Sequence, residues 1–189
     1  MRRWRRTLTA AATVLALAGC GGSSFHGSTD SNFGGGANTV EQIATADRKA
    51  PVTVSGTTLD GRALSTASWR GQVVVLNYWG SWCGPCVKET PDLKAAWAQL
   101  KDKQVQFLGL DSMESAATAK GYMDASGLTY PSLQWGDGRF LLQLKGAVRA
   151  PPTTVVLDAQ GRVAARVLAP VSTATLVGLV QDVQTGAAG

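Results

Sequence analysis

The chain has 189 residues, and its 18 Lys and Arg against 13 Asp and Glu give a net charge of +5. Four of the positive charges are arginines in the first six residues, MRRWRR. The rest of the chain holds 14 Lys and Arg against 13 Asp and Glu. The excess positive charge therefore belongs to the amino terminus. No other basic tract indicates a nucleic-acid-binding protein.

The amino terminus has the pattern of an export signal. The arginines precede the apolar stretch LTAAATVLALAG at 8–19, which is shorter than the ~20 residues of a membrane-spanning helix. We expect residues 1–19 to be a signal peptide. LAGC, which ends at Cys20, resembles the lipobox of bacterial lipoproteins and implies cleavage before Cys20 and lipid on it. An uncleaved anchor and an ordinary signal peptide that ends near a cysteine stay alternatives. The pair Arg5-Arg6 leaves Sec and Tat export open.

Residues 20–48 are expected to form a flexible tether. The segment GGSSFHGSTDSNFGGGANT after Cys20 is rich in Gly and Ser and has no hydrophobic period. It contains the only histidine, His26, which a solvated linker explains better than catalysis does. We place the folded domain at 49–185 and a short tail at 186–189.

The expected domain alternates strand and helix patterns. A hairpin is predicted around LDGR at 59–62 and another over TTVVLDAQGRVAARVL at 153–168. Two nearly all-apolar runs predict strands buried on both faces, VVVLNYW at 73–79 and VQFLGLD at 105–111. Apolar spacing, caps and the proline at position 85 predict helices at 85–103, 115–127 and, with Ser172 as N-cap, 172–184, with a short one in 138–146. This order predicts an α/β domain with a central mixed β-sheet flanked by helices.

Cys83 and Cys86, in WCGPC, could serve as a disulfide staple, part of a metal site or a working thiol pair. A staple across two residues closes a very small loop and restrains the unfolded chain little. A zinc site needs four ligands, and the expected domain has no other cysteine and no histidine. We therefore expect no metal and no cofactor other than the cysteine pair itself.

The thiol pair has a spacing that divides the chemical work. Cys83 falls where the predicted helix begins, and the positive end of the helix dipole favours its thiolate, the nucleophile. Cys86, one turn later, is placed to resolve the mixed disulfide and to be shielded. We expect Trp82 to cover the site, Gly84 to permit the turn and Pro85 to restrict the backbone in the first helical turn.

NYWGSWCGPCVKETP at 77–91 resembles the active-site segment of thioredoxin-fold proteins, especially the membrane-tethered ResA/TlpA-like thiol-disulfide oxidoreductases. RAPPTTVVLDAQGR resembles their cis-proline loop and following hairpin. The resemblance covers about residues 50–183 and implies a thioredoxin-like fold with an N-terminal β-hairpin extension. It further implies that Pro152, followed by Thr153, is a cis-proline against the thiols, and that Pro91 kinks the helix.

The resemblance also bears on proton transfer. Asn77 stands where thioredoxins have a buried aspartate that moves protons for the resolving cysteine, and an amide cannot titrate. ResA-like proteins imply a glutamate after the next strand, and Glu114 falls there. We expect Glu114 to accept the proton of the Cys86 thiol, with Asp111 as its rival, although both acids would also suit a helix start. Pro151 has no N–H, so a bound segment would lose one ladder hydrogen bond.

The family implies a lipid-anchored enzyme at the outer face of the cytoplasmic membrane that reduces disulfides of exported proteins. Apocytochrome c, during cytochrome c biogenesis, is the substrate that the resemblance suggests, and a membrane protein of the DsbD/CcdA type is the electron donor. We expect a monomer. A disulfide-forming oxidase and a non-catalytic binding or chaperone module remain alternatives, whereas WCGPC disfavours a peroxide-reducing enzyme. Copper delivery is disfavoured because we expect Met113 and Met123 to be packing residues.

Overall fold

The computed structural model describes residues 39–186. The predicted signal peptide, Cys20, the tether up to residue 38 and residues 187–189 lie outside this range. The strands are β1 (Val40–Gln42), β2 (Ser55–Thr57), β3 (Ala63–Ser65), β4 (Val73–Trp79), β5 (Val105–Asp111), β6 (Ser132–Leu133), β7 (Thr153–Leu157) and β8 (Val163–Val167). The helices are the 3-10 turn η1 (Thr66–Trp69), α1 (Gly84–Leu100), α2 (Ala116–Ser126), α3 (Phe140–Gln143) and α4 (Thr173–Thr185).

A mixed six-stranded sheet forms the centre, in the order β1-β8-β7-β4-β5-β6. The central strand β4 pairs parallel with β5 and antiparallel with β7. The predicted closing hairpin is confirmed as β7–β8, and the predicted N-terminal hairpin is confirmed as the separate two-stranded sheet β2–β3. The fold is the expected thioredoxin-like α/β fold.

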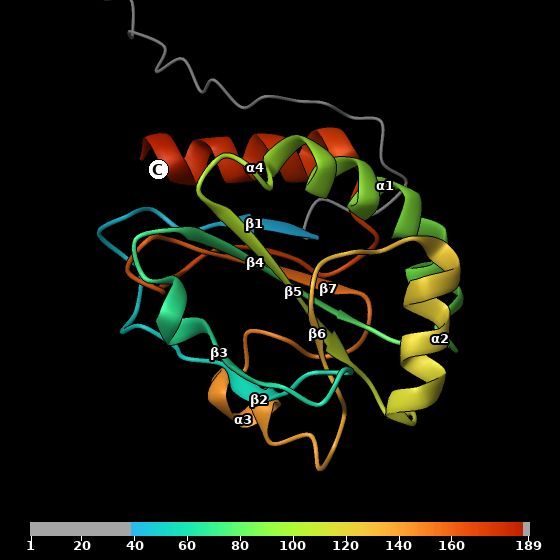
Figure 1. Ribbon diagram of the computed structural model, residues 1–189. Coiled ribbons are helices and arrows are strands. Elements are labelled where there is room, and N and C mark those ends of the chain that lie inside the picture. Colours follow the sequence, from blue (N-terminus) through green and yellow to red (C-terminus); the bar gives the residue numbers. More distant parts are fainter. Residues whose placement is uncertain (1–38, 187–189) are drawn as a thin grey trace, which may run out of the picture. The chain divides into compact units, whose positions relative to one another are not determined.

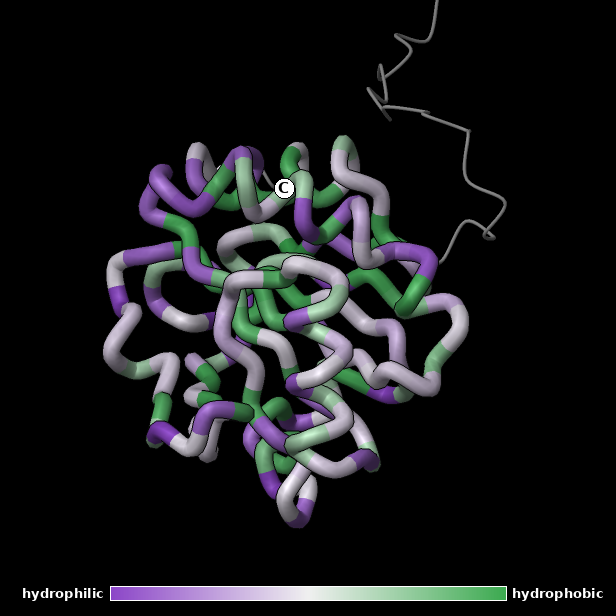
Figure 2. The backbone as a smooth tube through the Cα atoms, turned by 45° about the vertical axis from the view of Figure 1, so that its right-hand side comes forward, coloured by the Kyte–Doolittle hydropathy of each residue, from purple (hydrophilic) through white to green (hydrophobic). Residues whose placement is uncertain are grey.

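Both faces of the sheet are covered, as the unbroken apolar run of β4 predicted. Figure 1 shows α1 and α4 on one face and the β2–β3 hairpin with α3 on the other. Alternate residues of β4 point into two cores, Val73 and Val75 toward the helices, and Val74 and Leu76 toward the hairpin. In Figure 2 the most apolar segments lie inside and the hydrophilic ones follow the surface turns.

Capping residues set the ends of the longer helices. Ser115 and Ser172 are N-caps whose hydroxyls accept from the N–H groups of Thr118 and Thr175, so the predicted cap at Ser172 is confirmed. Gly127 ends α2 in the left-handed conformation, with a φ of 70°. Helix α1 continues through Pro91. Because proline lacks an N–H, the helix loses one internal hydrogen bond there.

The domain begins before residue 49, so the prediction of a tether through residue 48 is wrong for its last part. β1 pairs antiparallel with β8, with Val40 opposite Val167. Arg48 is buried, and its guanidinium lies 3.2 Å from the Asp158 carboxylate. The three-residue strand VEQ has no apolar alternation to reveal it. Its position depends on the edge that β8 offers.

Candidate active site

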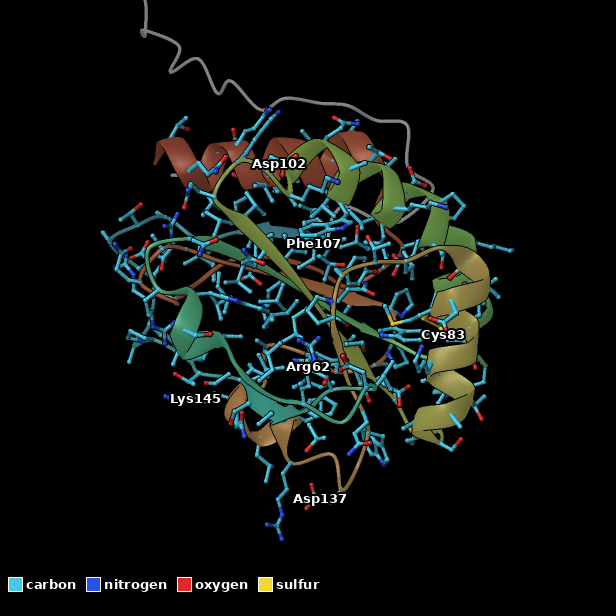
Figure 3. The ribbon with its side chains drawn as sticks, viewed as in Figure 1. Arg62, Cys83, Asp102, Phe107, Asp137 and Lys145 are labelled. Carbon is cyan, nitrogen blue, oxygen red and sulfur yellow. A yellow bond between two sulfur atoms is a disulfide. The ribbon has the colours of Figure 1, made fainter. Side chains whose placement is uncertain are left out.

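The two cysteines of WCGPC lie where β4 passes into α1 (Figure 3). Cys83 is the N-cap of α1 and has extended backbone angles, and its sulfur accepts from the N–H of Cys86 at 3.3 Å. Gly84 opens the helix, and Pro85 lies in its first turn, as predicted. The strand-to-helix turn therefore places one sulfur at the positive end of the helix dipole and the other one turn along.

Cys83 and Cys86 form a disulfide, with their Cα atoms 5.2 Å apart. Cys83 is 5% exposed and Cys86 is 3% exposed. In this oxidised form the expected contrast between an open and a shielded cysteine is therefore small. Both belong to the core cluster that includes Trp79, Leu93 and Tyr130.

Trp82 is tied to the neighbouring strand. Its indole N–H donates to the Ser112 carbonyl at 2.6 Å, and 52% of the residue is exposed. The indole lies against Gly80, where a Cβ would stand 2.7 Å from Trp82 Nε1, so no larger residue fits there without a shift. Trp82 thus joins the loop before Cys83 to the end of β5, and half of its surface faces solvent.

Glu114 binds the same loop. Its Oε1 accepts from the Ser81 N–H at 2.6 Å, and its Oε2 accepts from the Ser81 hydroxyl. Asp111, three residues before Glu114, is fully buried. Burial, followed by the neighbouring Glu114 carboxyl, raises the pKa of Asp111 to about 7. The predicted role of Glu114 toward Cys86 stays a prediction.

A second buried carboxyl, absent from the sequence-based predictions, lies on the helix of Cys86. Glu89 is 2% exposed and follows Cys86 by three residues, which places the two side chains on the same face of α1. Asn77 Nδ2 donates to its Oε1 at 2.9 Å, and the Val171 N–H donates to its Oε2 at 3.0 Å. Burial raises the pKa of Glu89 to about 7, although both of these hydrogen bonds lower it.

Asn77 completes this buried cluster. It lies on β4, and its Nδ2 also donates to the hydroxyl of Thr154 on the neighbouring strand β7 at 3.3 Å. Its Oδ1 is buried and has no hydrogen-bond partner among the described residues. The cluster therefore combines a group that titrates near neutral pH with an acceptor that can take one more hydrogen bond.

The peptide bond between Pro151 and Pro152 is cis, as predicted, and the packing of Pro152 against the thiols stays a prediction. Thr153 begins β7, opposite Tyr78 of β4, and its hydroxyl donates to the Ala150 carbonyl at 2.6 Å. The proline pair thus leads directly into β7, the neighbour of the strand β4 that precedes the cysteines.

Residues 45–181 match the family model described as Redoxin. The chain belongs to the redoxin family. Among curated proteins, this redoxin is 30% identical to the thiol-disulfide oxidoreductase ResA of Bacillus thuringiensis subsp. konkukian over 125 residues, which cover 66% of this chain and 70% of the relative.

Solved structures agree with this assignment. The redoxin is similar to a DsbF homologue from Corynebacterium diphtheriae, with a TM-score of 0.70, 31% identity and coverage of 78% of this chain and 94% of that one. It is also similar to a secreted thiol-disulfide isomerase from Corynebacterium glutamicum, with a TM-score of 0.68, 29% identity and coverage of 80% and 94%. This redoxin is a ResA/TlpA-like thiol-disulfide oxidoreductase.

Within residues 39–186 of the redoxin, no three His, Cys, Asp or Glu side chains gather so that they could hold a metal ion. None of the helices in this range is both long enough and apolar enough to cross a membrane. Enzymes of this class exchange electrons through a cysteine pair, and Cys83–Cys86 is the disulfide in the described part of the chain.

The sequence contained a signal for Glu89. The buried positions of α1 are Cys86, Glu89, Thr90, Leu93, Ala96 and Leu100, which lie along one side of the helix. Glu89 thus occupies an inward position in a mostly apolar stripe, where an unpaired carboxylate is costly. The helical spacing of these buried positions would have predicted that Glu89 lies on the same face as Cys86, about one turn further along α1.

Proposed function

We propose that this redoxin reduces disulfides of exported proteins at the outer face of the cytoplasmic membrane, where lipid on Cys20 anchors it. The signal-like residues 1–19 and the LAGC segment support export and lipidation. The similar protein from Corynebacterium glutamicum is described as secreted, which agrees with an extracytoplasmic site. Residues 20–38 would then serve as the tether.

The proposed reaction transfers two electrons from the reduced cysteine pair to a substrate disulfide. The Cys83 thiolate attacks one substrate sulfur, forms a mixed disulfide and expels the other substrate sulfur as a thiolate. The Cys86 thiolate then attacks the Cys83 sulfur, restores the Cys83–Cys86 disulfide and expels the second substrate thiolate. Both substrate thiolates take up protons. A membrane electron donor of the DsbD/CcdA type returns the pair to its reduced form.

The observation that carries the proposal is the Glu89 carboxyl, buried on the face of α1 that holds Cys86. Its pKa of about 7 suits a base that accepts the thiol proton of Cys86 at neutral pH. In the structure the Asn77 Nδ2 donates a hydrogen bond to Glu89, which suits the ionised carboxylate. If the amide turns by 180°, its Oδ1, which has no partner among the described residues, can accept a hydrogen bond from the protonated carboxyl. Glu114 is the alternative acceptor.

The same carboxyl favours reduction over oxidation of substrates. A strongly oxidising pair has a reduced form that the protein stabilises, typically as a thiolate. Here the Cys83 sulfur accepts one hydrogen bond from a backbone N–H among its described contacts. The Glu89 carboxyl lies on the buried face of α1 that also holds Cys86. The resemblance to ResA supports apocytochrome c as one substrate.

The reduction potential of the Cys83–Cys86 pair tests this direction. Equilibration of the full-length protein with dithiothreitol buffers should give a value near the thioredoxin end, about −270 mV. A value near about −120 mV would identify a disulfide-forming oxidase instead.

An insulin-reduction assay tests the enzymatic role itself. We expect turnover with the wild-type chain and none with Cys83→Ser, because the attacking sulfur is lost. Arg62→Ala, which breaks an exposed ion pair on the hairpin, is the control and should retain the wild-type rate. If the wild-type chain bound cysteine-containing partners without turnover, the protein would be a binding module.

A further inference from the structure

Three exposed apolar residues lie on segments that border Cys83 or contact the loop leading to it. The exposed large apolar residues within 39–186 are Val40, Trp82, Val87, Met113, Leu142 and Leu168. Trp82 directly precedes Cys83, and the N–H of Val87 donates to the Cys83 carbonyl at 3.0 Å. Met113 lies in the loop between β5 and α2 that binds Trp82. Isolated exposed apolar residues need no explanation, but a group of them beside a reactive sulfur indicates a contact surface.

The backbone on both sides of Met113 is held against the loop that leads to Cys83. Ser112 accepts from the Trp82 indole at 2.6 Å, and Glu114 accepts from the Ser81 N–H at 2.6 Å. The fully buried Asp111 further fixes this loop, because its carboxyl accepts from the Ser112 N–H at 2.8 Å. Met113 is therefore positioned beside the active-site loop by its neighbours on either side.

Neither local backbone preference nor core packing explains a methionine at this position. Its φ of 54° lies in the left-handed region, which Asn and Gly adopt far more readily than Met. The residue is 60% exposed, so the sequence-based expectation that Met113 packs inside is wrong, whereas Met123 is buried as expected. Backbone strain of this kind is often found at functional sites. A flexible, polarizable thioether suits a surface that accepts varied partners.

We propose that Met113 and Trp82 form a docking surface for the substrate segment that carries the disulfide, and that Met113 favours segments with an apolar side chain next to the attacked cysteine. The occupant is a polypeptide because a substrate disulfide must reach Cys83, which directly follows Trp82. The inference thus rests on the proposed attack by Cys83. It adds a substrate preference that this attack does not require.

The test uses the full-length chain with Cys86→Ser, so that the reaction stops at the mixed disulfide. Cys83 forms a bond to one sulfur of a cyclic peptide disulfide, and the other peptide sulfur leaves as a thiolate that takes a proton from water. Two peptides differ only in the residue beside the cysteines, Leu in one and Ser in the other. Mass spectrometry of quenched samples gives the rate of mixed-disulfide formation for each.

We expect Met113→Asn to lower the rate with the Leu peptide about tenfold relative to the rate with the Ser peptide, the factor that burial of most of a methionine side chain supplies. Asn tolerates positive φ, so the variant should fold, and Met113→Gly should act in the same direction. Leu142→Asn is the matched control, because it removes a 78% exposed apolar side chain from α3, which binds β2 through Gln143. It should leave the ratio unchanged.

An unchanged ratio in Met113→Asn would overturn the proposal. So would an equal loss with both peptides, which would mean that Met113 acts on the reactivity of Cys83 and makes no contact with the neighbouring residue. If Cys83 formed no mixed disulfide with either peptide in the parent chain, the proposed function would fail as well, and the two failures are therefore distinguishable.

Discussion

Glu89 should make the stability of the protein depend on pH. Burial raises the pKa of its carboxyl from 4.5 to about 7. In the unfolded chain the carboxyl ionises near pH 4.5, whereas in the folded protein it stays protonated up to about pH 7. The folded state binds more protons in this window. The free energy of unfolding therefore falls as the pH rises, and the contribution of Glu89 levels off above about pH 7.

The expected size follows from the two pKa values. One pKa unit corresponds to about 1.4 kcal/mol, so the interval from 4.5 to about 7 amounts to about 3 kcal/mol. Glu89→Gln removes this titration. Between about pH 4 and about pH 8, the variant should lose about 3 kcal/mol less free energy of unfolding than the wild-type protein does. Asp111 titrates in both proteins, so its contribution cancels in the difference.

Urea unfolding of the oxidised full-length chain at the two pH values gives the required free energies. Asp92→Asn is the matched control, because Asp92 lies on the same helix and accepts from the backbone N–H of Thr173, the first residue of α4, at 2.9 Å, but is only half-buried. It should retain most of the pH dependence, reduced slightly because the Asp92 charge also raises the pKa of Glu89. Parallel pH profiles for Glu89→Gln and the wild-type protein would refute the reasoning.

Two further predictions concern kinetics and a buried ion pair. Glu89→Gln should slow resolution of a mixed disulfide by Cys86 at pH 7 by about a hundredfold, the lower end of the range for a lost general base, and more than Glu114→Gln does. Rapid-quench assays measure both rates, and the reverse order would make Glu114 the proton acceptor. Arg48→Ala should lower the free energy of unfolding by about 3 kcal/mol because it leaves a buried carboxylate with one partner fewer, whereas Arg62→Ala, in an exposed pair, should cost less than about 1 kcal/mol in the same urea assay. Equal effects would mean that the Arg48 pair adds nothing beyond a surface contact.

Much of the fold follows from local patterns in the sequence. The apolar runs at 73–79 and 105–111 predicted buried strands because a strand covered on both faces has no polar side to show. Ser172 and Gly127 marked helix ends for local reasons. The Ser172 hydroxyl accepts from a backbone N–H in the first turn of α4, and Gly127 readily adopts the left-handed conformation that ends α2. The cysteine pair was recognisable because its spacing and its place before a helix carry the chemistry.

Other features depend on contacts that are distant in the sequence. β1 is a strand only because β8 offers it an edge, so residues 40–42 looked like linker. Met113 resembled a core residue, and only the tertiary structure shows that its neighbours are held by Ser81 and Trp82 while its side chain is exposed. Hydropathy alone does not record which apolar residues are left at the surface.

The sequence by itself determined the chemistry of this redoxin, because a thiol pair at a helix start is specified within a few neighbouring residues. The tertiary structure decided which acids accompany that pair. Glu89 acquires its raised pKa from burial against Asn77 and Val171, residues 12 and 82 positions away along the chain. Desolvation and hydrogen bonding depend on which groups surround a carboxyl in space, and that arrangement exists only after the sheet and helices have packed.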